Sequence, residues 1–245
     1  SEPALKAALD HAFEEPPAPP FRRTKAVVVV HDGKVIAERY AAGIGIGTPL
    51  LGFSMTKSVV NALIGILTQQ GLVTPSMPAP IPEWRGADDP RREIEVEHLM
   101  RMTSGLDLDE TNSGFDPSSR MYLHDDTAAY AVNTKMIAPL GTRWHYSSPT
   151  TQILARIVRD AVGGPEQTLA FAWRELFNPL GMRHVTLEFD ASGTLQGSTY
   201  MLASARDWAK FGEFLRNGGA LRGAQLLPHG WIEFINRTFT GVVSV

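Results

Sequence analysis

Apolar side chains recur along the chain at two different spacings, which predict helices in some segments and strands in others. Residues 3–13 carry apolar positions three and four residues apart, the spacing of an amphipathic helix. Residues 26–30 form an unbroken, mostly β-branched apolar run, and residues 35–40 alternate between apolar and polar. Asp32-Gly33 between them is typical of a tight turn, so the pattern predicts a β-hairpin whose first strand is buried on both faces.

The clearest helix is predicted at residues 54–70. Its apolar residues follow helical spacing, and Gly71 stands where a glycine often ends a helix. Two segments rich in turn-forming residues, 75–90 and 105–120, predict irregular loops. Further helices are predicted at residues 94–102, 126–134, 150–161, 166–177 and 204–217, and a short strand at residues 184–189.

This order of elements predicts the fold class α+β, with an antiparallel sheet flanked by helices and a mostly helical inserted domain. We expect residues 1–76 and 196–245 to form the sheet-and-helix domain, and residues 77–195 to form the helical one. A two-stranded hairpin is only marginally stable by itself. The predicted hairpin therefore needs further strands or helices against it.

Composition excludes several classes of function. The 245 residues are 43% hydrophobic, which is ample for a sizeable core. The net charge is −3 and there is no basic block, so we expect no nucleic-acid partner. No apolar run approaches the ~20 residues of a membrane helix, so we expect no membrane span in this segment. The chain has no cysteine, and its seven histidines include no pair at helical ligand spacing. We therefore expect no metal site and no cofactor.

Ser54 and Lys57 form the strongest candidate for chemistry, because they open the clearest helix three residues apart. Residues at that spacing share one helix face, and helical side chains lean toward the N-terminus, which brings the lysine amine toward the serine. The free N–H groups of a helix start favour negative charge on the serine oxygen. A lysine accepts a proton only as the neutral amine, a form that apolar surroundings favour. The same tetrapeptide also fits an N-capping serine beside a solvated lysine.

Four stretches together resemble one family. Ser-Met-Thr-Lys-Ser at 54–58 follows the hairpin, and the three others are HLMRMTSGL at 98–106, PLGTRWHYSS at 139–148 and SARDWAKFG at 204–212. They are similar, in order, to the nucleophile motif, the "hLLxMTSGL" segment, the "PGxxxxYSN" segment and the "SAxDLAxFG" helix of the serine β-lactamase and penicillin-binding-protein superfamily. That superfamily includes class C β-lactamases, DD-peptidases, esterases and 6-aminohexanoate-oligomer hydrolases.

The resemblance implies roles for individual residues. Ser54 is then the nucleophile that forms an acyl-enzyme, and Lys57 is its base or the partner of its base. Tyr146 matches the tyrosine of Y-x-N and would shuttle the proton between Ser54, the leaving group and the deacylating water. Ser148 stands where the family usually has asparagine, as a substrate-binding residue. A serine lacks the second donor of an amide, which favours an ester or small-amide substrate over a β-lactam.

A second departure concerns the third family motif, K-T-G or its variants, which lies on a strand beside the active site. No lysine here precedes Ser-Gly or Thr-Gly, and His229-Gly230-Trp231 has no strand context. We therefore expect the chain to be the N-terminal portion of a longer protein, incomplete at its C-terminus. A C-terminal fragment of the same protein is accordingly a candidate partner, beside a small-molecule ester or amide substrate.

Three functions follow from these observations. The leading interpretation is a serine hydrolase that cleaves an ester or small amide through an acyl-enzyme on Ser54. The alternatives are a penicillin-binding DD-peptidase or β-lactamase, and a non-catalytic binding protein with a β-lactamase-like fold. The missing K-T-G-like motif counts against a DD-peptidase or β-lactamase. The same absence supports a non-catalytic binding protein. The resemblance favours a periplasmic or secreted protein, while the residues themselves leave the cytoplasm open.

Overall fold

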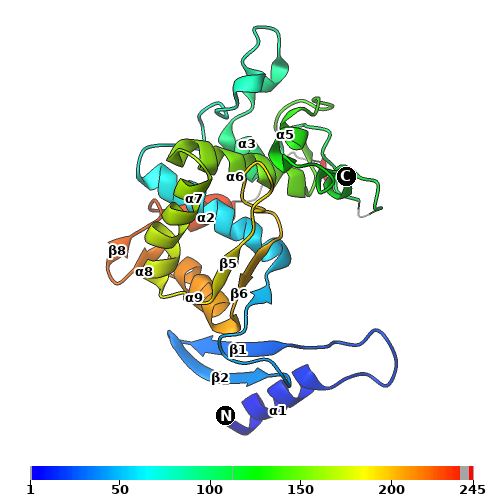
Figure 1. The fold of residues 1–245 in the computed structure, drawn as a ribbon. Coiled ribbons are helices and arrows are strands. Elements are labelled where there is room, and N and C mark those ends of the chain that lie inside the picture. The colour runs from blue at the N-terminus through cyan, green and yellow to red at the C-terminus, as the bar shows by residue number, and fades with distance from the viewer. Residues whose placement is uncertain (1, 112, 238–242, 245) are drawn as a thin grey trace.

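The computed structural model describes residues 2–111, 113–237 and 243–244. Figure 1 shows helices gathered around α2, with a β-hairpin and α1 below them. The helices are α1 (Glu2–Phe13), α2 (Thr56–Gln69), α3 (Val96–Met100), α4 (Pro117–Met121), α5 (Thr127–Val132), α6 (Ser148–Val162), α7 (Pro165–Phe171), α8 (Asn178–Leu180), α9 (Ala205–Arg216) and α10 (Trp231–Ile235). A π-helical turn at Ala172–Phe177 joins α7 to α8.

The strands form small sheets, mostly antiparallel. They are β1 (Ala26–His31), β2 (Lys34–Tyr40), β3 (Leu50–Leu51), β4 (Arg143–Trp144), β5 (Val185–Leu187), β6 (Met201–Ala203), β7 (Ala220–Leu221), β8 (Ala224–Gln225) and β9 (Val243–Ser244). β1 and β2 form the predicted hairpin, β3-β6-β5 form a three-stranded sheet, β7 and β8 form a second hairpin, and β4 pairs with β9 in parallel. The predicted α+β class is confirmed, while the predicted division into two domains stays a prediction.

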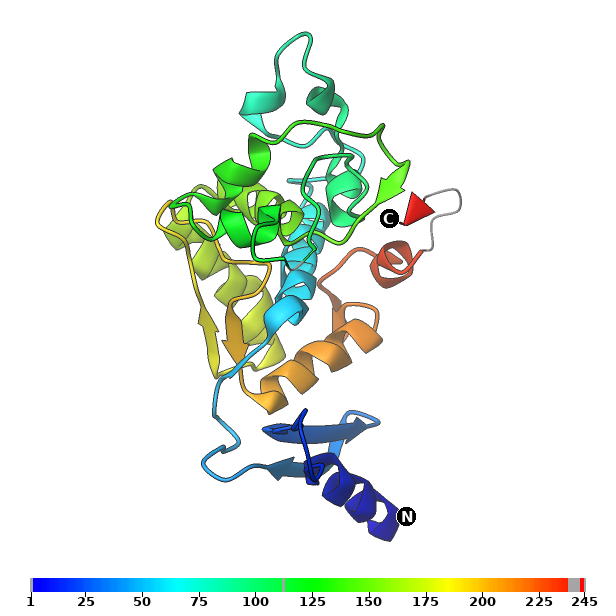
Figure 2. The same ribbon diagram turned by 90° about the vertical axis from the view of Figure 1, so that its right-hand side faces the viewer.

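The hairpin lies between two helices. α9 packs on β1, and α1 contacts β2 on the other side, as Figure 2 shows. Arg206 of α9 donates two hydrogen bonds to Glu38 of β2 and so ties the two elements together. The prediction that the valine run of β1 is buried on both faces is wrong, because its residues are only half-buried. Within the described residues β1 pairs with β2 alone, so its other edge has no strand beside it.

Helix α2 runs through the centre of the molecule. Nine of its residues are buried, and its apolar side chains join one continuous cluster that also takes in α3, α6 and the π-helical turn. α6 packs against α2, α3 and α5. Burying a whole aliphatic side chain stabilises a fold by about 2 kcal/mol, so this central position holds the start of α2 in a fixed place.

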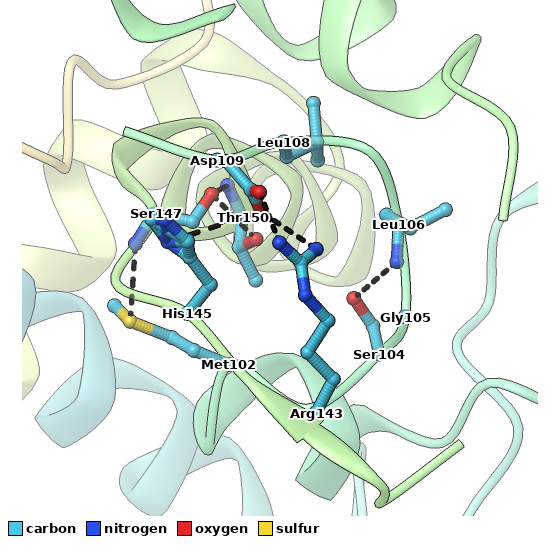
Figure 3. A pocket seen from close by; sticks show the side chains of 10 residues that line it. All are labelled: Met102, Ser104, Gly105, Leu106, Leu108, Asp109, Arg143, His145, Ser147 and Thr150. Carbon is cyan, nitrogen blue, oxygen red and sulfur yellow. Dashed lines mark hydrogen bonds and ion pairs between the residues drawn. The ribbon is translucent and has the colours of Figure 1, made fainter. Parts of the chain in front are cut away.

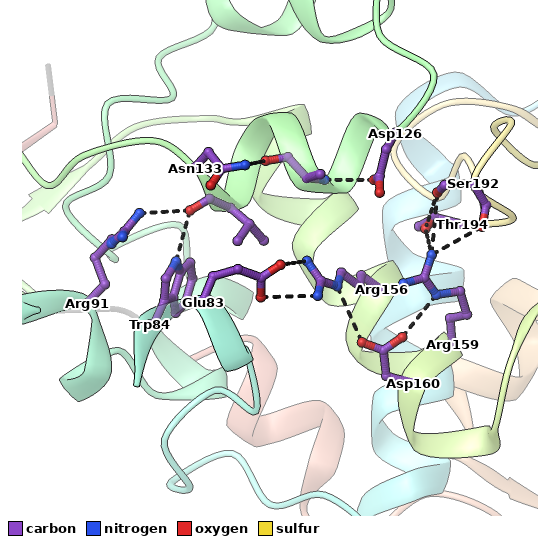
Figure 4. Close-up of polar contacts among 12 residues, drawn as sticks. Glu83, Trp84, Arg91, Asp126, Asn133, Arg156, Arg159, Asp160, Ser192 and Thr194 are labelled. Carbon is purple, nitrogen blue, oxygen red and sulfur yellow. Dashed lines mark hydrogen bonds and ion pairs between the residues drawn. The ribbon is translucent and has the colours of Figure 1, made fainter. Parts of the chain in front are cut away.

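Polar contacts hold the outer helices onto this core (Figure 4). Arg156 of α6 donates two hydrogen bonds to Glu83, at 2.8 and 3.1 Å, across 73 residues of sequence. The Trp84 indole N–H and the Arg91 guanidinium both donate to the carbonyl of Val132, at the end of α5. These bonds join the segment predicted to be a loop at 75–90 to the helices beside it.

Two further expectations need correction. The helix predicted at 94–102 is shorter, because it is only α3 (Val96–Met100), after which Met102 has a left-handed backbone with φ 57°. The segment 105–120 is not wholly irregular, since it contains most of α4. Asp116 caps that helix by accepting a hydrogen bond from the Ser119 N–H at 3.2 Å. A helix of five residues is too short to show a periodic pattern in sequence.

Gly105 is the glycine that we expect to be hardest to replace. Its φ is +73°, and an added Cβ would lie 2.1 Å from the carbonyl oxygen of Ala138. Gly141 has a similar φ of +69° with nothing near its Cβ position. We expect Gly105→Ala to lower the free energy of unfolding by about 3 kcal/mol or more and Gly141→Ala by only about 1 kcal/mol. Urea unfolding of the two variants measures both, and equal losses would contradict the steric explanation.

The carboxylate of Asp207 makes stability depend on pH. It is 1% exposed and accepts hydrogen bonds from Lys210 and from the N–H groups of His184 and Arg183, at 2.6, 2.8 and 3.1 Å. Although burial acts in the opposite direction, these bonds hold the pKa of Asp207 below its ordinary value. The carboxylate therefore stabilises the fold above the ordinary pKa near 3.8, and this contribution is lost as the pH falls through the lower folded value.

Asp207→Asn is expected to lower the free energy of unfolding by about 2 kcal/mol at neutral pH. The difference between wild type and variant should shrink as the pH falls below about 3.8, toward the lower pH at which the folded wild-type carboxylate is also protonated. Urea unfolding at several pH values measures the difference. A gap that stays constant down to that pH would show that the charge of Asp207 contributes nothing.

Candidate active site

Ser54 stands at the entrance to the central helix. Gly52 donates its N–H to the carbonyl of Met201 in β6 at 2.8 Å, and a Cβ at position 52 would come within 2.2 Å of the Trp208 ring. A single 3-10 turn over Phe53–Met55 then leads into α2. Phe53 has φ 47°, a backbone conformation that costs an aromatic residue energy, yet its side chain is 63% exposed. Strain of this kind, held next to a candidate nucleophile, is common at functional sites.

The amine of Lys57 lies at the centre of a small polar cluster. Its Nζ is 3.2 Å from the Oγ of Ser54, 3.0 Å from the Oγ of Ser148 and 2.8 Å from the carbonyl oxygen of Ser198. Lys57 comes from α2, Ser54 from the 3-10 turn before it, Ser148 from the first turn of α6 and Ser198 from the turn before β6. The structure thus brings Ser54, Lys57 and Ser148 together across 91 residues of sequence.

The three partners of Lys57 suit both forms of the amine. As an ammonium, Lys57 has three protons and three oxygen acceptors. As a neutral amine it has two protons and one lone pair. The carbonyl of Ser198 only accepts, and the hydroxyl of Ser148 can accept, which leaves the lone pair for the hydroxyl of Ser54. The cluster can therefore take the Ser54 proton without rearranging.

Tyr146 lies beside Lys57, whose Nζ is 4.9 Å from the centre of its ring. This is a cation–π distance. The hydroxyl of Tyr146 makes no hydrogen bond within residues 2–111, 113–237 and 243–244, so its role as a proton shuttle stays a prediction.

Side-chain contacts hold residues 143–148, the stretch that carries Tyr146, on either side of that tyrosine in the sequence. Figure 3 shows the pocket beside this stretch. Arg143 forms two hydrogen bonds with the carboxylate of Asp109, and the Ser147 N–H contacts the Sδ of Met102 at 3.3 Å. Ser147 also caps α6 by accepting from the Thr150 N–H at 3.2 Å. A small cavity of about 20 Å³ remains between these side chains, enough for one water molecule.

Ser148 is buried beside Lys57. It was predicted to bind substrate, and here it is 4% exposed and accepts from Lys57 as the first residue of α6. Its N–H donates to the carboxylate of Glu110 at 2.7 Å. As positioned, Ser148 shapes the environment of the lysine, and a direct substrate contact stays a prediction.

Sequence reasoning missed three residues around Lys57. Ser198 contributes the carbonyl acceptor, and its hydroxyl and that of Thr199 lie 2.8 and 2.9 Å from the hydroxyl of Tyr122. The available signal was the polar run Gly-Ser-Thr-Tyr at 197–200, which stands directly before an apolar strand. A main-chain carbonyl has no sequence signature of its own, so the contact itself was not predictable.

A hollow of about 510 Å³ opens beside Lys57. It is lined on one side by Lys57, Ser58 and Asn61 of α2 and on the other by residues of α9 and α10. In the part of the chain that the structure describes, no three His, Asp or Glu side chains are grouped as metal ligands. Among the same residues, no helix combines the length and apolar character needed to span a bilayer.

Comparisons with known proteins identify the family of the chain. The family model described as Beta-lactamase matches residues 9–241. The 6-aminohexanoate-dimer hydrolase of Paenarthrobacter ureafaciens is 27% identical over 231 residues, covering 86% of this chain and 57% of that protein. The chain thus spans little more than half of that curated relative.

Solved structures show the same fold at low identity. A provisionally assigned 6-aminohexanoate-dimer hydrolase from Bacillus anthracis aligns with a TM-score of 0.73 at 24% identity, over 94% of this chain and 61% of that one. A penicillin-binding protein from Bacillus halodurans aligns with a TM-score of 0.65 at 16% identity, over 85% of this chain and 73% of that one. Since the family model spans nearly the whole sequence, the chain belongs to the β-lactamase family.

Proposed function

We propose that this chain carries the nucleophile of a serine hydrolase that cleaves a small amide or ester through an acyl-enzyme on Ser54. The observation that carries the proposal is the position of the Lys57 amine, which is bonded at once to Ser54, Ser148 and the Ser198 carbonyl. A solvated lysine beside an N-capping serine would not be held by acceptors from two distant segments. Ser54 also caps no N–H group of α2, since the cap position of that helix has no side-chain bond.

The proposed reaction has two halves. In the first, the Oγ of Ser54 attacks the substrate carbonyl carbon while its proton passes to the neutral amine of Lys57. The bond to the leaving amine or alcohol then breaks, and the leaving group takes that proton directly or through Tyr146. In the second, water attacks the ester on Ser54, and the bond between the acyl carbon and the Oγ of Ser54 breaks. The proton of that water passes by the same route to the Oγ of Ser54, and the acid is released. The N–H groups at the start of the helix favour the negative charge that develops nearby.

An amide substrate is supported by the relative whose name gives its substrate. The Paenarthrobacter enzyme acts on a dimer of 6-aminohexanoate, in which an amide bond joins two linear aliphatic units. Ser148 in place of the usual asparagine removes a donor that would contact a β-lactam side chain. We therefore place linear aliphatic amides and simple esters ahead of β-lactams as substrates.

A turnover panel tests the proposal. Purified protein is incubated with short-chain nitrophenyl esters, with linear 6-aminohexanoate oligomers and with benzylpenicillin, and the products are quantified by chromatography. Hydrolysis of an ester or linear amide that exceeds penicillin hydrolysis by about tenfold or more supports the proposal. Faster reaction with penicillin would favour the β-lactamase or DD-peptidase alternative. If a folded protein hydrolyses none of the three, the hydrolase proposal fails and a binding role is favoured.

A further inference from the structure

The two acceptors that hold Lys57 besides Ser54 are themselves held by one segment of the chain. The carboxylate of Glu110 accepts from the N–H of Ser148 at 2.7 Å, and the hydroxyl of Tyr122 lies 2.8 Å from that of Ser198. Glu110 and Tyr122 belong to residues 109–111 and 113–122, hereafter the clamp segment. We propose that the clamp segment positions Lys57 for catalysis through Glu110 and Tyr122, an inference that rests on the proposed function of Lys57.

The contact of Glu110 fixes the start of α6. One carboxylate oxygen of Glu110 accepts from both the N–H of Ser148 and the hydroxyl of Ser118, at 2.7 and 2.8 Å. A carboxylate at a helix N-terminus is bound strongly, because the first N–H groups of a helix have no partner in the helix itself. Ser148 is thereby held where its hydroxyl meets the Lys57 amine. Asp109, the neighbour of Glu110, pairs with Arg143, which precedes Tyr146 in the sequence as Ser148 follows it.

The contact of Tyr122 fixes the turn before β6. Its hydroxyl bonds to those of Ser198 and Thr199, at 2.8 and 2.9 Å, and those two lie 3.3 Å from each other. Each of the three hydroxyls can donate one bond and accept one, so the ring is complete. Burial raises the pKa of Tyr122, although its bonds to Ser198 and Thr199 act the other way, so the phenol remains a donor at neutral pH.

The turn is also held from its other side. The backbone N–H of Ser198 donates to the buried Gln152 side chain at 3.1 Å, and the Thr199 carbonyl accepts from Thr56 at 3.1 Å. These bonds hold the turn in the position from which the Ser198 carbonyl accepts a hydrogen bond from Lys57 at 2.8 Å. Losing the Tyr122 bond would let the turn shift, and small shifts of a catalytic group have large effects on rate.

The clamp segment keeps its own shape through local bonds. Asp116 accepts from the N–H groups of Ser113 and Ser119, at 2.8 and 3.2 Å, at the start of α4. Its pKa is lowered by these backbone bonds, although burial acts the other way, so it remains ionised at neutral pH. Since α4 carries Tyr122 at its end and Ser118 in its first turn, Glu110 and Tyr122 are linked within one structural unit.

The test uses hydroxyl and carboxylate deletions with matched controls. Tyr122→Phe keeps the ring and its edge contact with Tyr200, whose centroid is 5.6 Å away, and removes only the bonds to the turn. Tyr200→Phe is the control, because the Tyr200 hydroxyl makes no hydrogen bond within the described residues. Glu110→Ala removes the carboxylate, and Glu110→Gln restores an acceptor oxygen and so serves as the rescue.

Two measurements are made on each variant. The first is the rate of covalent labelling of Ser54 by a fluorophosphonate across a pH series. The second is the rate at which acetic anhydride acetylates Lys57, followed by peptide mass spectrometry, which needs no enzyme activity. We expect Tyr122→Phe and Glu110→Ala to slow labelling about tenfold, to displace its pH profile and to change Lys57 acetylation at least about threefold. Tyr200→Phe and Glu110→Gln should stay within about twofold of wild type.

The inference is overturned if Tyr122→Phe and Glu110→Ala keep the wild-type pH profile and the wild-type acetylation of Lys57, even where their melting temperatures fall. That result would give the clamp segment a structural role alone. If the wild-type protein itself gives no serine adduct, the proposed function fails. The acetylation rates then decide by themselves whether Glu110 and Tyr122 hold the amine.

Discussion

Replacing Ser54 with alanine is expected to lower hydrolysis of the best substrate by at least about a thousandfold, to the level of the uncatalysed reaction plus any residual stabilisation by the site. The oxygen that the substitution removes is the atom that forms the bond to the acyl group. Lys57 is positioned to accept a proton and does not take the place of that oxygen as the nucleophile. Initial rates at saturating substrate measure the effect. A variant that keeps more than about a tenth of the activity would contradict the assignment of Ser54.

Folding of the Ser54→Ala variant should be nearly unchanged. Ser54 is exposed, and its only described side-chain contact is the 3.2 Å bond to Lys57. Surface substitutions of this kind alter the free energy of unfolding by about 0.5 kcal/mol. Urea unfolding of wild type and variant therefore provides the control. If the variant loses stability as well as activity, the loss of activity would be explained by misfolding and not by the missing nucleophile.

Lys57→Met is expected to slow acylation of Ser54 by about 10²- to 10⁴-fold, the usual contribution of a general base. Methionine has a similar length and no ionisable group, so the packing along the side chain is largely kept. Rapid mixing with a nitrophenyl ester, followed by quenching and mass spectrometry, measures the rate at which the acyl adduct appears. An acylation rate within about tenfold of wild type would show that Lys57 is not the base.

The Lys57→Met variant also removes three hydrogen bonds, so its stability needs a separate check. The Ser198 carbonyl and the Ser148 hydroxyl lose a partner at positions that are 0% and 4% exposed. Unpartnered buried groups cost about 1–3 kcal/mol each in the worst case. Lys57→Arg is the matched variant, because it keeps a cation that can bond to Ser148 and Ser198 but cannot act as a neutral base. If Lys57→Arg folds as stably as wild type and still acylates slowly, the loss of rate comes from the missing base and not from altered packing.

Much of the fold follows from local pattern. The periodic run at 54–70 gives α2, the Asp32-Gly33 pair gives the β1–β2 turn, and Ser204 caps α9 by accepting from the Asp207 N–H at 3.2 Å. The local pattern could not predict how deeply β1 is buried. Whether one or both faces of a strand are covered depends on elements that lie far away in the sequence. β3 and β6 have two and three residues, too few for a period to appear.

Some residues of the candidate site could be predicted from the sequence, and others could not. Ser54 lies in the 3-10 turn that leads directly into α2 and Lys57 in the first turn of α2, so their contact follows from the spacing of three residues along one helical stretch. Tyr146 and Ser148 came from resemblance, and the structure places both beside Lys57. Ser198 and Tyr122 were missed, because their roles depend on a carbonyl and a hydroxyl that meet the site across 141 and 76 residues of sequence. No local spacing encodes such contacts.

The central claim is that Ser54 is an activated nucleophile, and covalent labelling tests it most directly. Intact-protein mass spectrometry is carried out on the 26.8 kDa chain and on Ser54→Ala, each with and without a fluorophosphonate. We predict one adduct per wild-type chain, located on the peptide that contains Ser54, and none on the variant. A folded wild-type chain without an adduct, or a variant that labels as fast as wild type, would contradict the claim.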